Sequence, residues 1–198
     1  MDYKKLYKEK LTTAQEAVKH IPSNSRVVTA HATGEPTVIV DAMVDNYLQY
    51  ENVEIVHLVA MGNCGYVRPE MKGHLRHNAI FVGAGTREAV NDGRADFTPS
   101  FFYQVPKLFR TALPVDVAMI QVTPPDENGN CSFGVSCDFT KPAAEAAKIV
   151  IAQVNDQMPY IYGDNFINIK DIDYVVEVSK PLLELKPPTI GDVEKAIG

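Results

Sequence analysis

Abundant cysteine, long apolar runs and an excess of basic residues are all missing from this sequence. Three cysteines among 198 residues are too few for the disulfide framework of a small secreted domain, so we expect reduced thiols in a cytoplasmic protein. No apolar run reaches the roughly 20 residues that cross a membrane, and the polar start predicts no secretory signal. With 19 Lys and Arg against 25 Asp and Glu, the net charge of −6 disfavours nucleic acid as a partner.

Familiar nucleotide and metal motifs are also missing. Gly83 and Gly85 begin a dinucleotide-like pattern, but Glu88 stands where its third glycine would fall. No Lys-Ser or Lys-Thr pair follows these glycines to complete a P-loop. His74 and His77 are close enough to share a metal on a helix, yet the charged segment offers no clear third ligand. We therefore predict surface histidines, no metal site and no permanently bound cofactor.

The sequence does contain a repeated order of strand, turn and helix. Runs rich in apolar and β-branched residues predict strands at residues 26–30, 53–60, 79–82, 115–122, 149–154 and 174–178. Several of these runs are apolar throughout, which is typical of parallel strands buried on both faces. We therefore predict an α/β fold with an open, mainly parallel sheet and helices on both faces.

Cap signals predict where several helices begin. Thr13 and Glu16 have the spacing of a capping box before a helix that ends near Ile21. Pro36 suits the first turn of a second helix, because its missing N–H has no helical partner there. Thr140 is placed to cap an alanine-rich helix over residues 143–148.

The final residues resemble the start of the chain. Residues 189–192 repeat the capping pattern of residues 13–16, and the apolar spacing that follows is the same. Residues 186–188, Lys-Pro-Pro, have the composition of a linker. We therefore assign residues 1–186 to one α/β domain. Residues 187–198 are predicted to be a linker and the start of a C-terminal domain that is missing from this chain.

Four loops follow successive predicted strands, at residues 31–36, 61–65, 83–86 and 99–106. Ligands of parallel α/β sheets bind outside the carboxyl ends of the strands, so these loops predict a crevice, although each is also explained as a tight turn. Glu35 is the only acid within a glycine-bearing crevice loop. It is either a base or nucleophile, or an acid that complements a helix dipole.

An aromatic cluster lies in and beside the last of these loops. It consists of Phe97, Phe101, Phe102 and Tyr103. Packing in the core or against another domain is the favoured interpretation of this cluster, and an apolar wall for an acyl chain is the alternative.

Several segments match one known family in order along nearly the whole chain. They are Ala-Thr-Gly-Glu-Pro at residues 32–36, the aromatic segment at residues 100–109, Pro-Pro-Asp-Glu-Asn-Gly-Asn-Cys-Ser-Phe-Gly at residues 124–134, and residues 163–167 and 171–178. With these segments the chain resembles the acetyl-CoA hydrolase/transferase family, a class I CoA-transferase family. The resemblance is greatest to its 4-hydroxybutyrate and butyryl-CoA:acetate CoA-transferase branch.

The resemblance implies a complete enzyme of about twice this length, with two similar α/β domains that assemble as a homo-oligomer. A glutamate of the second domain attacks an acyl-CoA thioester and forms a mixed anhydride and then a glutamyl-CoA thioester. A short-chain carboxylate such as acetate finally takes the CoA. Because the segment for that glutamate is missing, the resemblance implies no catalytic residue here and an N-terminal half that is inactive alone.

The resemblance also implies substrate-binding positions on the crevice loops. They are Gly34, Pro36, Met61, Gly62, Gly85, Thr86 and Gln104, whose amide is able to hydrogen-bond a carboxylate. Two other functions stay open: an acyl-CoA hydrolase half, and a non-catalytic module that binds a carboxylate or CoA.

Overall fold

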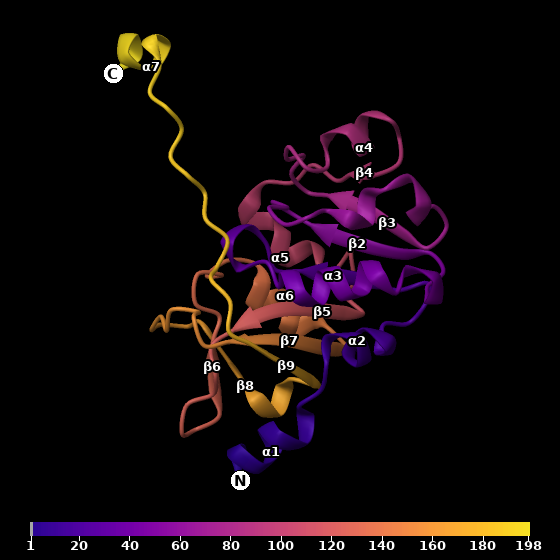
Figure 1. The fold of residues 1–198 in the computed structure, drawn as a ribbon, viewed down its shortest axis with the longest axis vertical. Helices are drawn as coiled ribbons and strands as arrows, with labels where there is room; N and C mark the ends of the chain where they lie inside the picture. The colour runs from indigo at the N-terminus through magenta and orange to yellow at the C-terminus, as the bar shows by residue number, and fades with distance from the viewer. Residues whose placement is uncertain (1) are drawn as a thin grey trace.

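The computed structural model describes residues 2–198, and its centre is a seven-stranded sheet (Figure 1). Every strand pair in this sheet is parallel, and the strand order is β4-β3-β2-β1-β5-β7-β9. The strands are β1 (Arg26–Thr29), β2 (Val53–His57), β3 (Leu75–Ala79), β4 (Asp96–Phe97), β5 (Val117–Val122), β7 (Ile149–Asn155) and β9 (Tyr174–Val178). The predicted α/β fold with a parallel sheet is confirmed.

The remaining elements surround this sheet. Two strands, β6 (Asn130–Ser132) and β8 (Phe166–Asn168), form a separate antiparallel pair that the sequence did not reveal. The helices are α1 (Tyr3–Lys10), α2 (Ala14–Ala17), α3 (Thr37–Asp45), α4 (Arg87–Asn91), α5 (Val105–Leu108), α6 (Thr140–Ala146) and α7 (Asp192–Ile197). No helix within residues 2–198 has the length and apolar character needed to span a membrane.

Both faces of the sheet are buried. Neighbouring residues of a strand point to opposite faces, so two consecutive residues of β1 show what covers each face. In β1, Val27 packs in the core cluster that contains α2 and α3 residues. Val28 belongs to a different cluster with residues of α5 and α6. The near-continuous apolar strands are therefore explained by helices on both faces, as the sequence predicted.

The strand order changes direction beside β1. The chain runs outward from β1 through β2 and β3 to β4, and then returns to place β5 on the other side of β1. In open α/β sheets, the loops at such a point diverge and leave a crevice at the carboxyl ends of the strands. The fold therefore points to the carboxyl ends of β1 and β5 as the place for a ligand.

The predicted helix starts were only partly right. Thr13 caps α2 as expected, because its side chain accepts a hydrogen bond from the Glu16 N–H. Pro36 is the N-cap residue of α3 and so lies one position before the predicted first turn. Thr140 is wrong as a cap, because it is the first residue of α6 and donates to the Asp138 carboxylate.

The segment around His77 is a strand, so the prediction of surface histidines there is wrong for this residue. β3 covers residues 75–79 instead of the predicted strand at 79–82. Its polar residues are buried with partners: the Ile55 carbonyl lies at hydrogen-bond distance from His77 Nδ1, and Asn78 donates to Glu54. The polar composition hid the strand because the partners of these side chains lie on β2, more than 20 residues earlier in the sequence.

The last helix stands away from the rest of the molecule (Figure 1). Gly191 is the N-cap of α7, and its N–H donates to the Glu194 carboxylate, so the predicted cap at Thr189 is two residues early. Every residue of α7 is exposed. The division into residues 1–186 and 187–198 stays a prediction.

Candidate functional site

The four predicted loops lie together at the carboxyl edge of the sheet, because they follow β1, β2, β3 and β4. Two of them contain a non-glycine residue with left-handed backbone: Ala32 has a φ of 53° and Cys64 a φ of 49°. Neither residue type favours this conformation, which costs about 1 kcal/mol or more and is found most often near functional sites. The local backbone therefore singles out the loops after β1 and β2.

Glu35 joins these two loops. Its side chain is buried, and its Oε2 accepts hydrogen bonds from the backbone N–H groups of Met61 and Gly62, both at 2.9 Å. Burial raises the pKa of the Glu35 carboxyl, against the opposing effect of the two N–H groups. The carboxylate therefore binds the loop after β2. Its two hydrogen bonds come from that loop and not from the first turn of α3, the helix whose dipole it was expected to complement.

Two buried rings, those of His57 and Tyr66, lie next to each other beside Glu35. His57, the last residue of β2, has its Nε2 3.7 Å from Glu35 Oε2, which is too long for a hydrogen bond. Its Nδ1 and the Tyr66 hydroxyl are 2.7 Å apart and share a hydrogen bond. Burial lowers the pKa of His57 well below its ordinary value, so the ring is neutral and supplies no charge to Glu35.

The three predicted glycines are sites of close contact between loops. A Cβ on Gly62 would overlap the Glu35 carboxylate, and a Cβ on Gly34 would overlap the Ser136 hydroxyl. A Cβ on Gly85 would lie 2.7 Å from Cys64 Sγ. These glycines are therefore needed so that the protein's own loops approach each other.

The other four predicted positions differ in exposure. Pro36 and Thr86 are buried, whereas Met61 is half-buried at the loop surface. Gln104 is exposed, and its amide donates to the neighbouring Tyr103 hydroxyl at 3.3 Å. Of these four, Met61 and Gln104 are the side chains that solvent reaches.

Sequence reasoning missed a histidine–aspartate pair at this edge. His31 Nε2 lies 2.9 Å from Asp138 Oδ2, and both side chains are mostly buried. Burial alone would raise the pKa of Asp138, but hydrogen bonds from His31 and Thr140 hold it below its ordinary value. The two residues are 107 positions apart, so no local motif could have revealed the pair.

Buried polar atoms without partners gather at the same edge. Within residues 2–198 six such side-chain atoms occur, and four of them belong to loops. These four are His31 Nδ1, Glu35 Oε1, Thr86 Oγ1 and Ser136 Oγ. Buried polar groups nearly always have partners, so a concentration of unsatisfied ones favours a site that is completed by a ligand or another part of the protein.

The predicted aromatic cluster is exposed beside these atoms. Phe97, Phe101, Phe102 and Tyr103 are each half exposed or more, so packing in the core is wrong for them. The Phe102 ring lies 6.1 Å from the His31 ring, which links the cluster to the histidine–aspartate pair. The exposed aromatics thus extend the candidate site with an apolar surface.

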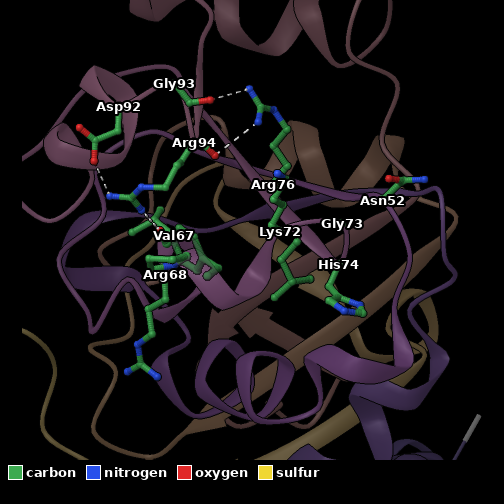
Figure 2. Close-up of a pocket in the computed structure, with 13 residues that line it drawn as sticks. Asn52, Val67, Arg68, Lys72, Gly73, His74, Arg76, Asp92, Gly93 and Arg94 are labelled. Atoms are coloured by element: carbon green, nitrogen blue, oxygen red, sulfur yellow. Dashed lines mark hydrogen bonds and ion pairs between the residues drawn. The ribbon is translucent and has the colours of Figure 1, made fainter.

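A different cavity, of about 470 Å³, lies at the opposite edge of the sheet, before β2, β3 and β4 (Figure 2). It is lined by several cations, but Arg76 binds Asp96 and backbone carbonyls, and Arg94 binds Asp92. The Arg68 side chain extends away from both (Figure 2). Arg76 and Arg94 are therefore engaged with the protein's own groups, and none of the seven predicted positions lines this cavity.

The family of the chain follows from its sequence. The family model of the acetyl-CoA hydrolase/transferase N-terminal domain matches residues 1–184. The chain belongs to the acetyl-CoA hydrolase/transferase family. The resemblance seen in the sequence motifs is confirmed.

Relatives in this family include CoA-transferases. The chain is 61% identical to the 4-hydroxybutyrate coenzyme A transferase of Clostridium kluyveri, over 100% of this chain and 46% of that protein. It is 30% identical to the butyryl-CoA:acetate CoA-transferase of Anaerostipes caccae, over 100% of this chain and 46% of that protein. The solved 4-hydroxybutyrate CoA-transferase from Porphyromonas gingivalis has a TM-score of 0.80 and 36% identity over 94% of this chain and 44% of that one. The chain therefore spans slightly less than half the length of these relatives.

Metal binding has little basis in the arrangement of side chains. The part of the chain from residue 2 onward holds no group of three or more His, Cys, Asp or Glu side chains that could bind a metal ion. His74 Nδ1 lies 2.6 Å from the Tyr50 carbonyl oxygen, and His77 is buried in β3.

Proposed function

We propose that this chain is the N-terminal half of a CoA-transferase. The complete enzyme moves CoA between an acyl-CoA, such as 4-hydroxybutyryl-, butyryl- or acetyl-CoA, and a carboxylic acid such as acetate. The observation that carries the proposal is the 61% identity to a 4-hydroxybutyrate coenzyme A transferase along the full chain. The position of two family motifs, residues 32–36 after β1 and residues 100–109 after β4, at the carboxyl edge of the sheet supports it.

In the proposed reaction the nucleophile is a glutamate outside this chain. Its carboxylate attacks the thioester carbonyl and the C–S bond breaks. This step releases the CoA thiolate and forms a mixed anhydride between the acyl group and the glutamate. The thiolate then attacks the glutamyl carbonyl, which releases the first carboxylate and leaves a glutamyl-CoA thioester. Acetate reverses the two steps and departs as acetyl-CoA. CoA is thus a substrate, and no permanently bound cofactor takes part.

The role of this chain is to form one wall of the acyl and carboxylate pocket. The wall consists of the predicted positions Gly34, Pro36, Met61, Gly62, Gly85, Thr86 and Gln104. Met61 and Gln104 present side chains to the substrate, because the other exposed or half-exposed members of the set, Gly62 and Gly85, are glycines without a side chain. The glycines let the supporting loops pack closely behind them.

The partners of the chain follow from the same proposal. The C-terminal domain covers the carboxyl edge, where the exposed aromatic cluster offers an apolar surface. The complete protein forms a homo-oligomer and works in the cytoplasm, where Cys64, Cys131 and Cys137 remain the free thiols seen in the structure.

The test of this proposal compares the chain alone with the complete protein that contains it. With butyryl-CoA and acetate, we expect the complete protein to form acetyl-CoA and the chain alone to form none. Omitting acetate separates transfer from hydrolysis, because a hydrolase releases free CoA at the same rate without it. Transfer by the isolated chain at the rate of the complete protein, or acetate-independent release of CoA, would contradict the proposal.

A further inference from the structure

Glu35 is a buried acid that the proposed chemistry leaves without a role. The residue is 2% exposed, and one of its carboxylate oxygens accepts hydrogen bonds from two consecutive backbone N–H groups, those of Met61 and Gly62. Successive N–H groups that converge on one point form an anion-binding concavity. Here the anion is the protein's own carboxylate, so these two N–H groups are not free to bind a substrate carboxylate.

The backbone of Glu35 is itself fixed from the sheet. Gln121 of β5 donates its amide N–H to the Glu35 carbonyl oxygen at 3.2 Å. The Gln121 side-chain oxygen in turn accepts from Gln153 and Asn155 of β7, each at 2.9 Å. All three amides are buried, so a satisfied network runs from two central strands to the loop after β1.

We propose that Glu35 is a positioning residue of the substrate pocket, which ties the loop after β2 to this network and thereby sets the place of Met61. The inference rests on the proposed transferase function. Within residues 2–198 Glu35 Oε1 has no hydrogen-bond partner, so the buried carboxylate is only partly satisfied. Burying a partly satisfied carboxylate lowers the free energy of unfolding. In return, its two hydrogen bonds fix the backbone of Met61 and Gly62.

Kinetics of the complete transferase test this role. We expect E35A to lower kcat/KM for acetate about tenfold or more, because small displacements of positioning groups have effects of that size. E35Q keeps an oxygen that accepts from both N–H groups and should stay within about threefold of the wild type. V150A, a buried change at the far end of β7, is the control for general loss of stability and should leave kcat/KM unchanged.

A second measurement covers the case in which E35A does not fold. The amide proton resonances of Met61 and Gly62 in the present chain should shift upfield in E35Q, because a neutral acceptor replaces a charged one. Unchanged amide resonances in E35Q, or a folded E35A enzyme with full kcat/KM, would overturn the proposal. A wild-type protein that transfers no CoA would refute the proposed function instead, and the amide shifts would still be measurable.

Discussion

At the scale of single residues, the glycines of the carboxyl edge are placed by contacts between loops. Gly62 faces the Glu35 carboxylate, which two hydrogen bonds and deep burial keep from moving aside. Gly83 lies in a neighbouring loop, where the nearest atom to an added Cβ, the Ala60 carbonyl oxygen, is 3.8 Å away. The two glycines therefore form a matched pair with opposite steric surroundings.

This difference predicts unequal effects of a single methyl group. G62A should lower the free energy of unfolding by about 1–3 kcal/mol, the usual cost of overpacking a tight site. G83A should change it by less than about 0.5 kcal/mol. Urea denaturation of both variants measures the difference, and equal free energies of unfolding would show that Glu35 yields to the added Cβ.

At the scale of elements, strand β3 carries a titratable residue in its interior. His77 is 1% exposed, and burial lowers its pKa to about 4 from an ordinary 6.5. The native state therefore binds fewer protons than the unfolded state between these two values. The contribution of neutral His77 to the free energy of unfolding is fully present above about pH 6.5. It is lost as the pH falls, and the loss reaches roughly 3 kcal/mol at about pH 4.

The contribution of His77 is measurable as a difference. The free energy of unfolding should fall more steeply between pH 7 and pH 5 in the wild type than in H77Q, because the glutamine does not titrate in this range. Groups remote from His77 titrate in both proteins and cancel in the comparison, whereas His57 and Asp96 interact with the charge of His77, so their coupling to it is part of the measured difference. Parallel pH profiles would mean that His77 accepts a proton without disturbing the strand.

The elements also show which parts of the fold were readable from sequence. Apolar strands such as β5, and the Thr13 cap of α2, were predicted because one local pattern decides each of them. β3 was misplaced, because the partners of His77 and Asn78 lie on β2 and are remote in sequence. The same reason hid the pairing of His31 with Asp138, whereas the crevice loops were readable from glycines that follow strands.

At the scale of the whole molecule, the features of the candidate site lie at one edge of the sheet. The sheet brings the family's loops to one edge, and unsatisfied polar atoms and exposed aromatics gather there within the described residues 2–198. The chain spans 46% of the length of its curated relatives named above. Both observations favour a half-site that a second domain completes.

The most direct test of this account is a chimera, in which the chain replaces the corresponding first part of the Clostridium kluyveri 4-hydroxybutyrate coenzyme A transferase. The measurement is the initial rate of acetyl-CoA formation from butyryl-CoA and acetate. We expect the chimera to transfer CoA within about tenfold of the natural enzyme, since the two sequences are 61% identical over this part. A folded chimera that binds both substrates but transfers no CoA would contradict the assignment of this chain as a transferase half.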